Sequence, residues 1–304
     1  MTNFTYNNHI SYSIGGRQFG YRETPYEKYE VSVGAIDPDH YRKSNWRQEQ
    51  FRIADMVYRD LGKDLVVMFS GGTDSEIVLR AFKHIGVTPR ALFVEFTSGF
   101  NASELIAARE VTKSLGLPLE VVRVDVEKFY RSGAAQEIAL SVQCASLAFL
   151  TIFDQIIKLQ APAVMGGTMT FYRRPTREGS EWFHSYAERD ECSAMRLSLK
   201  HSIPVVHDWF MYTPECMGYF FEDPGIQAVL TTRYNFKTWT DSSKNEVIDK
   251  WFPGILKKKK TGYENLSALR TESDITIGQS LIQILDGGLD GLSLEALRKQ
   301  LCLN

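Results

Sequence analysis

The hydrophobic positions between residues 61 and 175 follow two alternating periods. A continuous apolar run, typical of a strand buried on both faces, occupies residues 65–69, and further strands are predicted over residues 91–96, 119–126 and 161–168. Between them, apolar residues recur at helical spacing, after residue 76 and in 101–115 and 136–159. This alternation predicts an α/β core, a doubly wound parallel sheet of about five strands that binds its ligand beyond the strands' carboxyl ends.

The region before this core has a different pattern. Residues 1–60 predict an N-terminal extension, with a hairpin around Gly15-Gly16 and a helix over residues 46–60. Gly62 follows that helix where a glycine stop signal is expected.

Two further helix boundaries carry capping signals. Asn101, with Glu104 three residues later, resembles a capping box at the start of the helix over 101–115. Residues 176–304 predict a mainly helical C-terminal region, in which Ser293 caps a short final helix.

The corner between the first apolar run and the helix after it reads Ser-Gly-Gly-Thr-Asp-Ser, residues 70–75. Glycines at such a corner let backbone N–H groups turn toward one point, and the helix N-terminus adds partial positive charge, so an oxyanion is favoured there. The corner lacks the lysine of Walker-type loops and has Asp74 within the anion site instead. A carboxylate beside phosphates indicates a divalent cation between them, and Mg²⁺ is the expected one.

This corner resembles the S-G-G-x-D-S signature of the PP-loop ATP pyrophosphatases (adenine nucleotide alpha hydrolase-like fold), and the resemblance extends over about residues 64–168. It implies ATP and Mg²⁺ as cofactors. It also implies cleavage between the α and β phosphates, so that the substrate is adenylated and pyrophosphate leaves. The residues it implicates are Ser70, Gly71, Gly72, Thr73 and Ser75 for pyrophosphate, Asp74 for metal and catalysis, Gly166 and Gly167 for close approach to phosphates, and the backbone near Phe69 and Val94 for adenine and ribose.

A second stretch is similar to the synthetase domain of asparagine synthetases and of their β-lactam- and carbapenam-forming relatives. Residues 251–264, "WFPGILKKKKTGYE", resemble their L-P-x-x-I-L-x-R-x-K-x-x-F, with Lys258 at the arginine, Lys260 at the catalytic lysine and Tyr263 at the aromatic position. The similarity implies activation of a carboxylate or carbonyl, followed by attack of an amine or ammonia. A solvated lysine run or an anion patch accounts for the same residues without chemistry.

The chain departs from those synthetases in two places. Thr2 stands where their glutaminase domain has its cysteine nucleophile, so we expect ammonia, a separate glutaminase or a substrate amine to supply the nitrogen. The fourth strand continues as "MGGTMTF" without a carboxylate, so a second metal carboxylate is absent or comes from elsewhere. The candidates for it are Glu178, Asp190 and Asp208, while Arg173, Arg174 and Arg177 are candidates for anion contacts or ordinary surface arginines.

Other branches of the superfamily stay open as alternatives. A sulfur-transfer enzyme similar to PAPS reductases would carry a cysteine nucleophile near the C-terminus, but Cys302 follows helical spacing, and we predict a packed thiol. Thiolating and deazapurine-forming enzymes need cysteine pairs or a four-cysteine zinc site, whereas the four cysteines here lie far apart in the sequence. A nucleobase-modifying enzyme and a catalytically weak nucleotide-binding protein complete the alternatives.

Composition narrows the expected setting and partners. A chain of 304 residues with 43% hydrophobic content can bury a substantial core, and its net charge of −2 gives no field that favours nucleic acid or membranes. The first residues lack the pattern of a signal peptide, and no apolar run approaches membrane-spanning length. We therefore expect a cytoplasmic protein that acts on a small molecule bearing a carboxylate or carbonyl, without membrane or nucleic-acid partners; a homodimer is compatible with this expectation.

Overall fold

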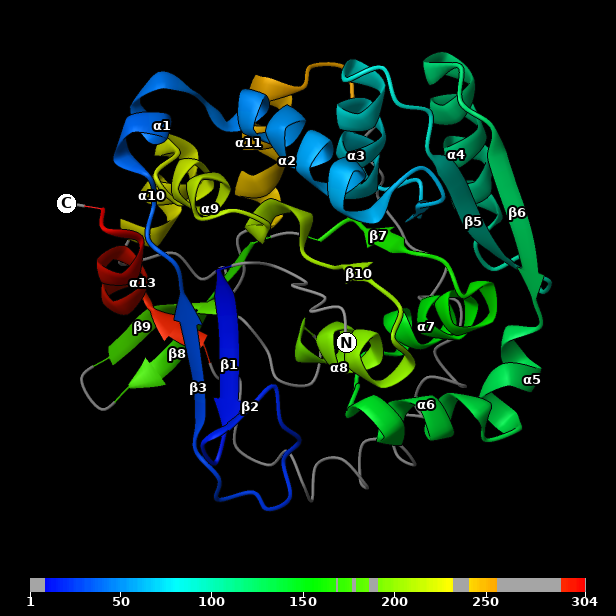
Figure 1. Ribbon diagram of the computed structural model, residues 1–304, viewed down its shortest axis with the longest axis horizontal. Helices are drawn as coiled ribbons and strands as arrows, with labels where there is room; N and C mark the ends of the chain where they lie inside the picture. Colours follow the sequence, from blue (N-terminus) through cyan, green and yellow to red (C-terminus); the bar gives the residue numbers. More distant parts are fainter. Residues whose placement is uncertain are drawn as a thin grey trace.

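The computed structural model describes residues 9–167, 169–176, 179–185, 191–231, 241–255 and 291–303. Its centre is a sheet of five parallel strands in the order β10-β7-β4-β5-β6, with helices on both faces (Figure 1). The strands are β4 (Val66–Met68), β5 (Arg90–Phe96), β6 (Leu119–Val124), β7 (Ala163–Met165) and β10 (Val205–Val206). The predicted doubly wound α/β fold is confirmed, and its fifth strand is β10.

The order of the strands defines a switch point at the centre of the sheet. From β4 the chain continues to β5 and β6 on one side, then returns to place β7 and β10 on the other side of β4. The connections after β4 and β7 therefore leave the same edge of the sheet in opposite directions. Ligands of doubly wound sheets bind in the crevice that opens at such a point.

Alternation along the strands creates two separate layers of core. In β4, Val67 packs with the core on one face of the sheet, whereas Val66 and Met68 pack on the other. Consecutive strand residues point to opposite faces, so a strand buried on both faces must be apolar at every position. This is why the central strand β4 reads as an unbroken apolar run in the sequence.

The helices divide between those faces (Figure 1). On one side lie α2 (Trp46–Leu61), α3 (Thr73–His84), α4 (Ala102–Leu115) and α9 (Pro214–Phe221). On the other lie α5 (Val126–Arg131), α6 (Ala134–Val142), α7 (Leu147–Leu159) and α8 (Glu191–His201). The remaining described helices are α1 (Pro38–Lys43), the 3₁₀ turn η1 (Trp209–Met211), α10 (Pro224–Thr231), α11 (Asp241–Trp251) and α13 (Leu294–Leu301).

The helix predicted over residues 136–159 is wrong as a single element. The structure has α6 and α7 instead, with Gln143 between them at a φ of +50°. The buried side-chain amide of Gln143 holds the backbone of Arg22, accepting from its N–H at 2.9 Å and donating to its carbonyl at 2.7 Å. The helix thus breaks at a residue whose hydrogen-bonding partner lies far away in the sequence, and the spacing of apolar residues carries no information about that partner.

The N-terminal hairpin is confirmed around Gly15-Gly16 and joins a small antiparallel sheet of order β2-β1-β3. Its strands are β1 (Ile10–Ile14), β2 (Arg17–Gln18) and β3 (Tyr29–Val33). The inward residues of β1 belong to the same buried core as α2 and α3. The predicted helix over 46–60 is also confirmed as α2, which ends at Gly62 with a φ of +78°.

The C-terminal region contains strands that the sequence did not reveal. A third sheet, of order β11-β9-β8, is formed by β8 (Thr170–Thr176), β9 (Gly179–Ser185) and β11 (Gly291–Ser293). The final helix is confirmed as α13, where the Ser293 side chain accepts from the Ala296 N–H at 3.1 Å. The packed thiol predicted for Cys302 is wrong, because α13 ends at Leu301 and Cys302 is exposed.

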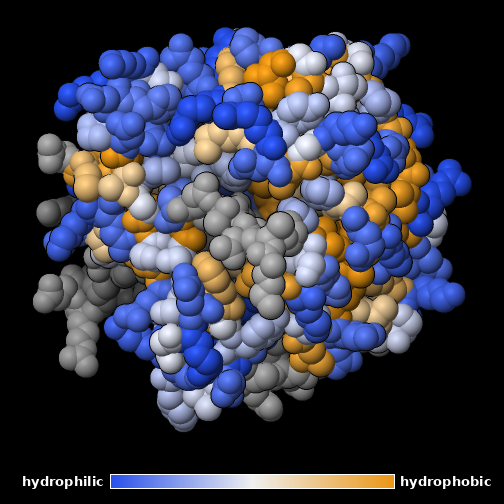
Figure 2. All heavy atoms as spheres, viewed as in Figure 1, coloured by the Kyte–Doolittle hydropathy of each residue, from blue (hydrophilic) through white to orange (hydrophobic). Residues whose placement is uncertain are grey.

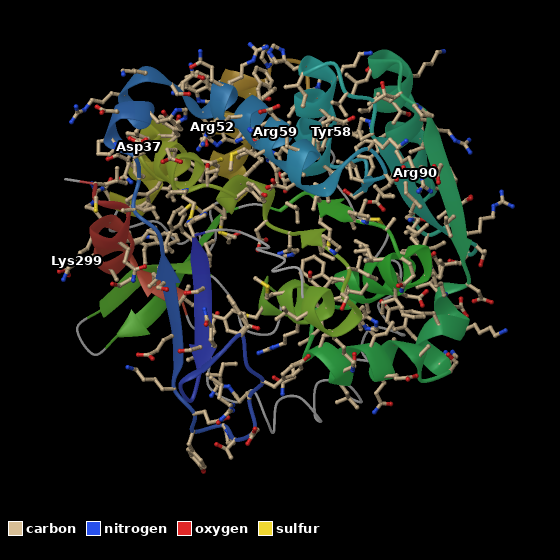
Figure 3. All side chains as sticks on the ribbon, in the orientation of Figure 1. Asp37, Arg52, Tyr58, Arg59, Arg90 and Lys299 are labelled. Atoms are coloured by element: carbon tan, nitrogen blue, oxygen red, sulfur yellow. The ribbon has the colours of Figure 1, made fainter. Side chains whose placement is uncertain are left out.

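Two ion pairs near the surface also join the side chains of the edge strand β6 to those of its neighbour β5. Arg90 binds Glu120 at 2.8 Å, and Arg123 binds Glu95 at 2.9 Å. Figure 3 shows Arg90 at this edge, and Figure 2 shows hydrophobic side chains reaching the surface on the same side of the molecule. Charged pairs on an edge strand oppose further strand addition.

Within the described part of the chain, no helix has the length and apolarity needed to cross a membrane.

Candidate functional site

The corner after β4 forms a tight glycine turn at the N-terminus of α3, which we call the anion-binding turn after its predicted role. Gly71 has a φ of +66°, a conformation that favours glycine, and Gly72 is the N-cap of α3 with extended backbone. No described side chain caps α3, so its first-turn N–H groups point out of the end of the helix. The hydroxyls of Ser70 and Ser75 are 3.1 Å apart, and Ser75 also donates to the Gly72 carbonyl at 3.1 Å. The turn is thus braced from within, and its open end suits an oxyanion.

The second Gly-Gly corner packs directly against this turn. A Cβ placed on Gly166 would lie 2.6 Å from the backbone nitrogen of Ser75 and 2.9 Å from the carbonyl carbon of Asp74. Any side chain at residue 166 would therefore displace the first turn of α3. The approach to phosphates predicted for Gly166 stays a prediction; the structure shows that residue 166 must be glycine for the two corners to pack backbone to backbone at the switch point.

An open pocket lies on the other side of the loop. It lies at the carboxyl ends of β4 and β5, under the first turn of α4 and part of α7. The predicted residues Phe69, Ser70 and Val94 all contribute to its wall. Most of the wall is apolar, and such pockets with a few polar groups are the usual form of small-molecule sites. The apolar wall and the place next to the loop of residues 70–75 suit an aromatic ring such as a nucleobase.

Asn101 shapes this pocket in a way that its sequence pattern did not indicate. Its side chain makes no cap bond to α4; the predicted capping box is wrong. Instead, its Oδ1 accepts from the Phe96 N–H at 2.9 Å and its Nδ2 donates to the Val94 carbonyl at 2.8 Å. The Asn101 amide thus fixes the end of β5 in the pocket wall. The Asn101 amide bonds a backbone N–H and a backbone carbonyl of β5 at once, so two buried polar groups gain partners where a helix cap would give a partner to one.

Of the three candidate carboxylates, Asp208 lies at this sheet edge. It follows β10, is 4% exposed, and has a φ of +50°. A Cβ placed on Gly167 would lie 2.3 Å from the Asp208 Cα and 2.7 Å from its Oδ1. Gly166 and Gly167 therefore separate the Asp74 turn from Asp208, one glycine packed against each.

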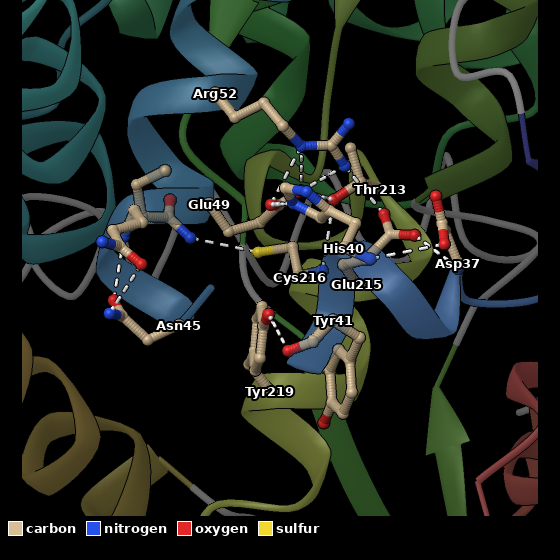
Figure 4. Close-up of polar contacts among 12 residues, drawn as sticks. Asp37, His40, Tyr41, Asn45, Glu49, Arg52, Thr213, Glu215, Cys216 and Tyr219 are labelled. Carbon is tan, nitrogen blue, oxygen red and sulfur yellow. Dashed lines mark hydrogen bonds and ion pairs between the residues drawn. The ribbon is translucent and has the colours of Figure 1, made fainter. Parts of the chain in front are cut away.

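A buried polar network supports the turn that carries Asp208. Trp209, the next residue, donates from Nε1 to the Gln50 side chain at 2.6 Å, and Gln50 donates to the Cys216 sulfur at 3.0 Å. Burial raises the pKa of the Cys216 thiol well above its ordinary value, so this cysteine is a structural group rather than a nucleophile. Figure 4 shows the neighbouring part of the network, centred on Glu49.

Glu49 is fully buried between α2, α1 and α9. It accepts from Arg52 Nη2 at 2.6 Å and from Thr213 Oγ1 at 2.6 Å, and its Oε2 lies 2.9 Å from His40 Nε2 (Figure 4). Burial acts to raise the pKa of Glu49, but the hydrogen bonds from Arg52, Thr213 and His40 outweigh it and lower that pKa. The carboxylate is therefore a charged structural centre that joins the helices behind the site.

The structure does not place every predicted site residue. Lys258, Lys260 and Tyr263 lie outside the described residues, as do Arg177, Glu178 and Asp190. Arg173 and Arg174 lie on β8. Phe69 to Ser75, Val94, Gly166 and Gly167 are brought together around the switch point. Among the described residues, no three His, Cys, Asp or Glu side chains gather as a ready metal cluster.

Comparisons with known proteins give one sequence match and several distant structural ones. A stretch of 76 residues is 42% identical to 7-cyano-7-deazaguanine synthase from Polynucleobacter asymbioticus, and it covers 25% of this chain and 30% of that protein. No protein-family model matches the chain.

Three solved structures are similar at low identity. A predicted tRNA methyltransferase subunit from Methanocaldococcus jannaschii is 20% identical, with a TM-score of 0.34 and 71% and 88% of the two chains covered. NMN synthetase from Francisella tularensis is 14% identical, with a TM-score of 0.32 and coverage of 80% and 96%. NH₃-dependent NAD synthetase from Campylobacter jejuni is 11% identical, with a TM-score of 0.32 and coverage of 82% and 96%.

TM-scores this low cannot support the assignment of a superfamily. The assignment therefore rests on the sheet order, the loop of residues 70–75 and the sequence match. Together they indicate the PP-loop ATP pyrophosphatase superfamily. The comparisons do not support the asparagine synthetase-like branch in particular.

Proposed function

We propose that this chain binds ATP at the switch point and cleaves it between the α and β phosphates, so that a carboxylate or carbonyl is adenylated and then attacked by an amine or ammonia. The observation that carries the proposal is one continuous site. The turn of residues 70–75 lies between the apolar pocket and the Gly166-Gly167 corner. A triphosphate that leaves the pocket would cross the open end of α3.

The roles of the residues follow from this placement. Phe69 and Val94 would flank the nucleoside, with the β5 backbone held by Asn101. Ser70, Gly71, Gly72, Thr73 and Ser75 would hold the pyrophosphate through N–H and hydroxyl groups. Such donors, fixed before the reaction begins, stabilise charge as it develops on the leaving group.

The site also has the chemistry that a divalent cation requires. Asp74 is an oxygen donor at the second position of α3, on the turn against which Gly166 packs, and Mg²⁺ prefers oxygen ligands together with substrate phosphates. Mg²⁺ bound there would neutralise phosphate charge and orient the triphosphate. We propose that Asp74 holds it.

Nucleotide products test the proposal directly. Incubation with ATP, Mg²⁺ and hydroxylamine as a general amine, over a panel of small carboxylates, should yield AMP, pyrophosphate and a hydroxamate, measured by ion-exchange chromatography. Ammonium but not glutamine should replace hydroxylamine. ADP and phosphate as the only products would refute the proposal, and ATP binding without turnover on any acceptor would favour the catalytically weak nucleotide-binding alternative.

A second candidate acceptor is a modified nucleobase. The 42% identity to a deazaguanine synthase over 76 residues favours it. Nucleobase-type carboxylates belong in the same panel as amino acids, with the same nucleotide products expected from both. Turnover confined to the nucleobase-type compounds would select this candidate.

Lys260 distinguishes the asparagine synthetase-like branch. If Lys260 is aimed at the charge that develops during acyl transfer, Lys260→Ala should lower kcat by roughly 10²-fold with little change in ATP affinity. Lys257→Ala and Lys259→Ala are matched controls, since these residues lie off the matched positions, and should be nearly silent. Equal behaviour of all three variants in steady-state kinetics would identify the run as a solvated anion patch.

A further inference from the structure

The carboxyl edge of the sheet has a second carboxylate within the phosphate region, on a strand that the loop motif does not include. Asp208 follows β10, two strands away from β4, and only the Gly166-Gly167 corner of β7 lies between it and the Asp74 turn. The two contacts are both backbone packing: Gly166 against Asp74-Ser75, and Gly167 against Asp208. Asp74 and Asp208 therefore flank the same two glycines.

The conformation of Asp208 is held against local preference. Its φ of +50° and ψ of 58° are left-handed, a region that is uncommon for residues other than glycine and that Asp adopts more often than most. Trp209 anchors the turn to Gln50, and the Phe210 N–H donates to the Gly167 carbonyl at 3.4 Å. Strained backbone that the surroundings hold in place is a common feature of functional sites.

The carboxylate itself is buried but incompletely satisfied. Its Oδ2 lies 2.6 Å from Nδ1 of the buried His207, yet it makes no hydrogen bond of good geometry among the described residues. Its Oδ1 lies against Gly167, where an added Cβ would come within 2.7 Å of it, so only glycine is tolerated beside this carboxylate. A buried carboxylate in this state is costly unless a cation or donor compensates it.

We propose that Asp208 is the second carboxylate for the divalent cation of this site, supplied by β10 instead of by the strand that ends in Gly166-Gly167. The inference rests on the proposed function, because a triphosphate must supply the other oxygens. Mg²⁺ in nucleotide sites is held by one or two carboxylates together with substrate phosphates, which fits a pair placed on either side of two glycines. His207 is then a positioning residue that orients the carboxylate.

Metal binding tests the assignment without turnover. Mn²⁺ affinity is measured by electron paramagnetic resonance on the full chain with α,β-methylene-ATP present, which cannot be cleaved at the α–β position. Asp208→Asn should weaken Mn²⁺ binding by at least about 10-fold, the scale of losses at metal sites, with an unchanged melting temperature. Asp223→Asn is the matched control: Asp223 is also a buried carboxylate with a basic partner, 2.9 Å from Lys250, but it lies in the turn between α9 and α10. It should leave Mn²⁺ affinity unchanged.

A second variant separates ligation from a structural role. Asp208→Cys should shift metal preference from Mn²⁺ toward Cd²⁺, because thiolates favour softer ions. No shift in preference, or Mn²⁺ affinity within about twofold of the original in Asp208→Asn, would overturn the assignment. If Asp74→Asn loses Mn²⁺ while both Asp208 variants keep it, only this inference fails; if Asp74→Asn also keeps it, the proposed function fails at its metal site.

Discussion

Asp74→Asn should reduce pyrophosphate release to background, a fall of about 10³-fold, while the protein stays folded. Asp74 occupies the second position of α3, on the turn against which Gly166 packs. Asparagine has nearly the same shape, and it keeps an oxygen that can accept from Thr73 Oγ1, which lies 3.4 Å from Asp74 Oδ1. What it loses is the negative charge that a divalent cation between protein and phosphates requires.

The measurement is pyrophosphate release at saturating ATP, with melting temperature as the test of folding. Asp64→Asn is the matched control, because Asp64 is exposed in the turn at the opposite, amino end of β4. It should retain full activity. Pyrophosphate release by Asp74→Asn at the original rate would remove Asp74 from the mechanism.

Glu49→Gln should cost about 3–5 kcal/mol of unfolding free energy, the range found when one partner of a buried ion pair is removed. Glutamine would leave the Arg52 guanidinium, 2.6 Å from the Glu49 carboxylate, with one fewer anion in the interior. Arg52 also binds Glu215 at 2.7 Å, so the pair is part of a network, and the loss should extend to the contacts of α9.

Urea unfolding at pH 7 measures this effect. Glu120→Gln is the control, since Glu120 forms an exposed pair with Arg90 at 2.8 Å, and it should cost at most about 1 kcal/mol. Equal losses for the two variants would mean that burial of Glu49 contributes nothing special.

The cost of Glu49→Gln should also depend on pH. The folded-state pKa of Glu49 is below its ordinary value of 4.5, so its charge stabilises the folded state fully above that value. As pH falls through the lower folded-state pKa, the carboxyl takes up a proton and this stabilisation is lost. The difference in unfolding free energy between Glu49→Gln and the original protein should therefore shrink below about pH 4.5.

The sequence was most informative where local rules are sufficient. A strand buried on both faces must be apolar throughout, so β4 and β7 were visible as apolar runs. A left-handed turn favours glycine, so Gly62 and Gly71 stood out. The anion-binding loop could be found for the same reason, because its glycines, hydroxyls and Asp74 lie next to one another in the chain.

Elements and contacts whose reasons lie far away in the sequence were missed. The two-residue strand β10 is too short for any period, and its pairing with β7 defines it. Gln143 breaks a helical pattern where it binds Arg22, and Asn101 turns from a helix cap to the strand β5. In each case a tertiary partner offers hydrogen bonds that outweigh the local preference.

The sequence by itself determined the strand–helix alternation, and with it the doubly wound sheet and the position of the loop of residues 70–75 at the end of its first strand. Only the tertiary structure showed that Asp208 packs against Gly167 at the same edge of the sheet. The physical reason is strand order: β10 adds to the sheet beside β7, and the glycine at residue 167 lets the Asp208 backbone approach to contact distance. Adjacency across a parallel sheet depends on which strands pair, and the local sequence does not encode that choice.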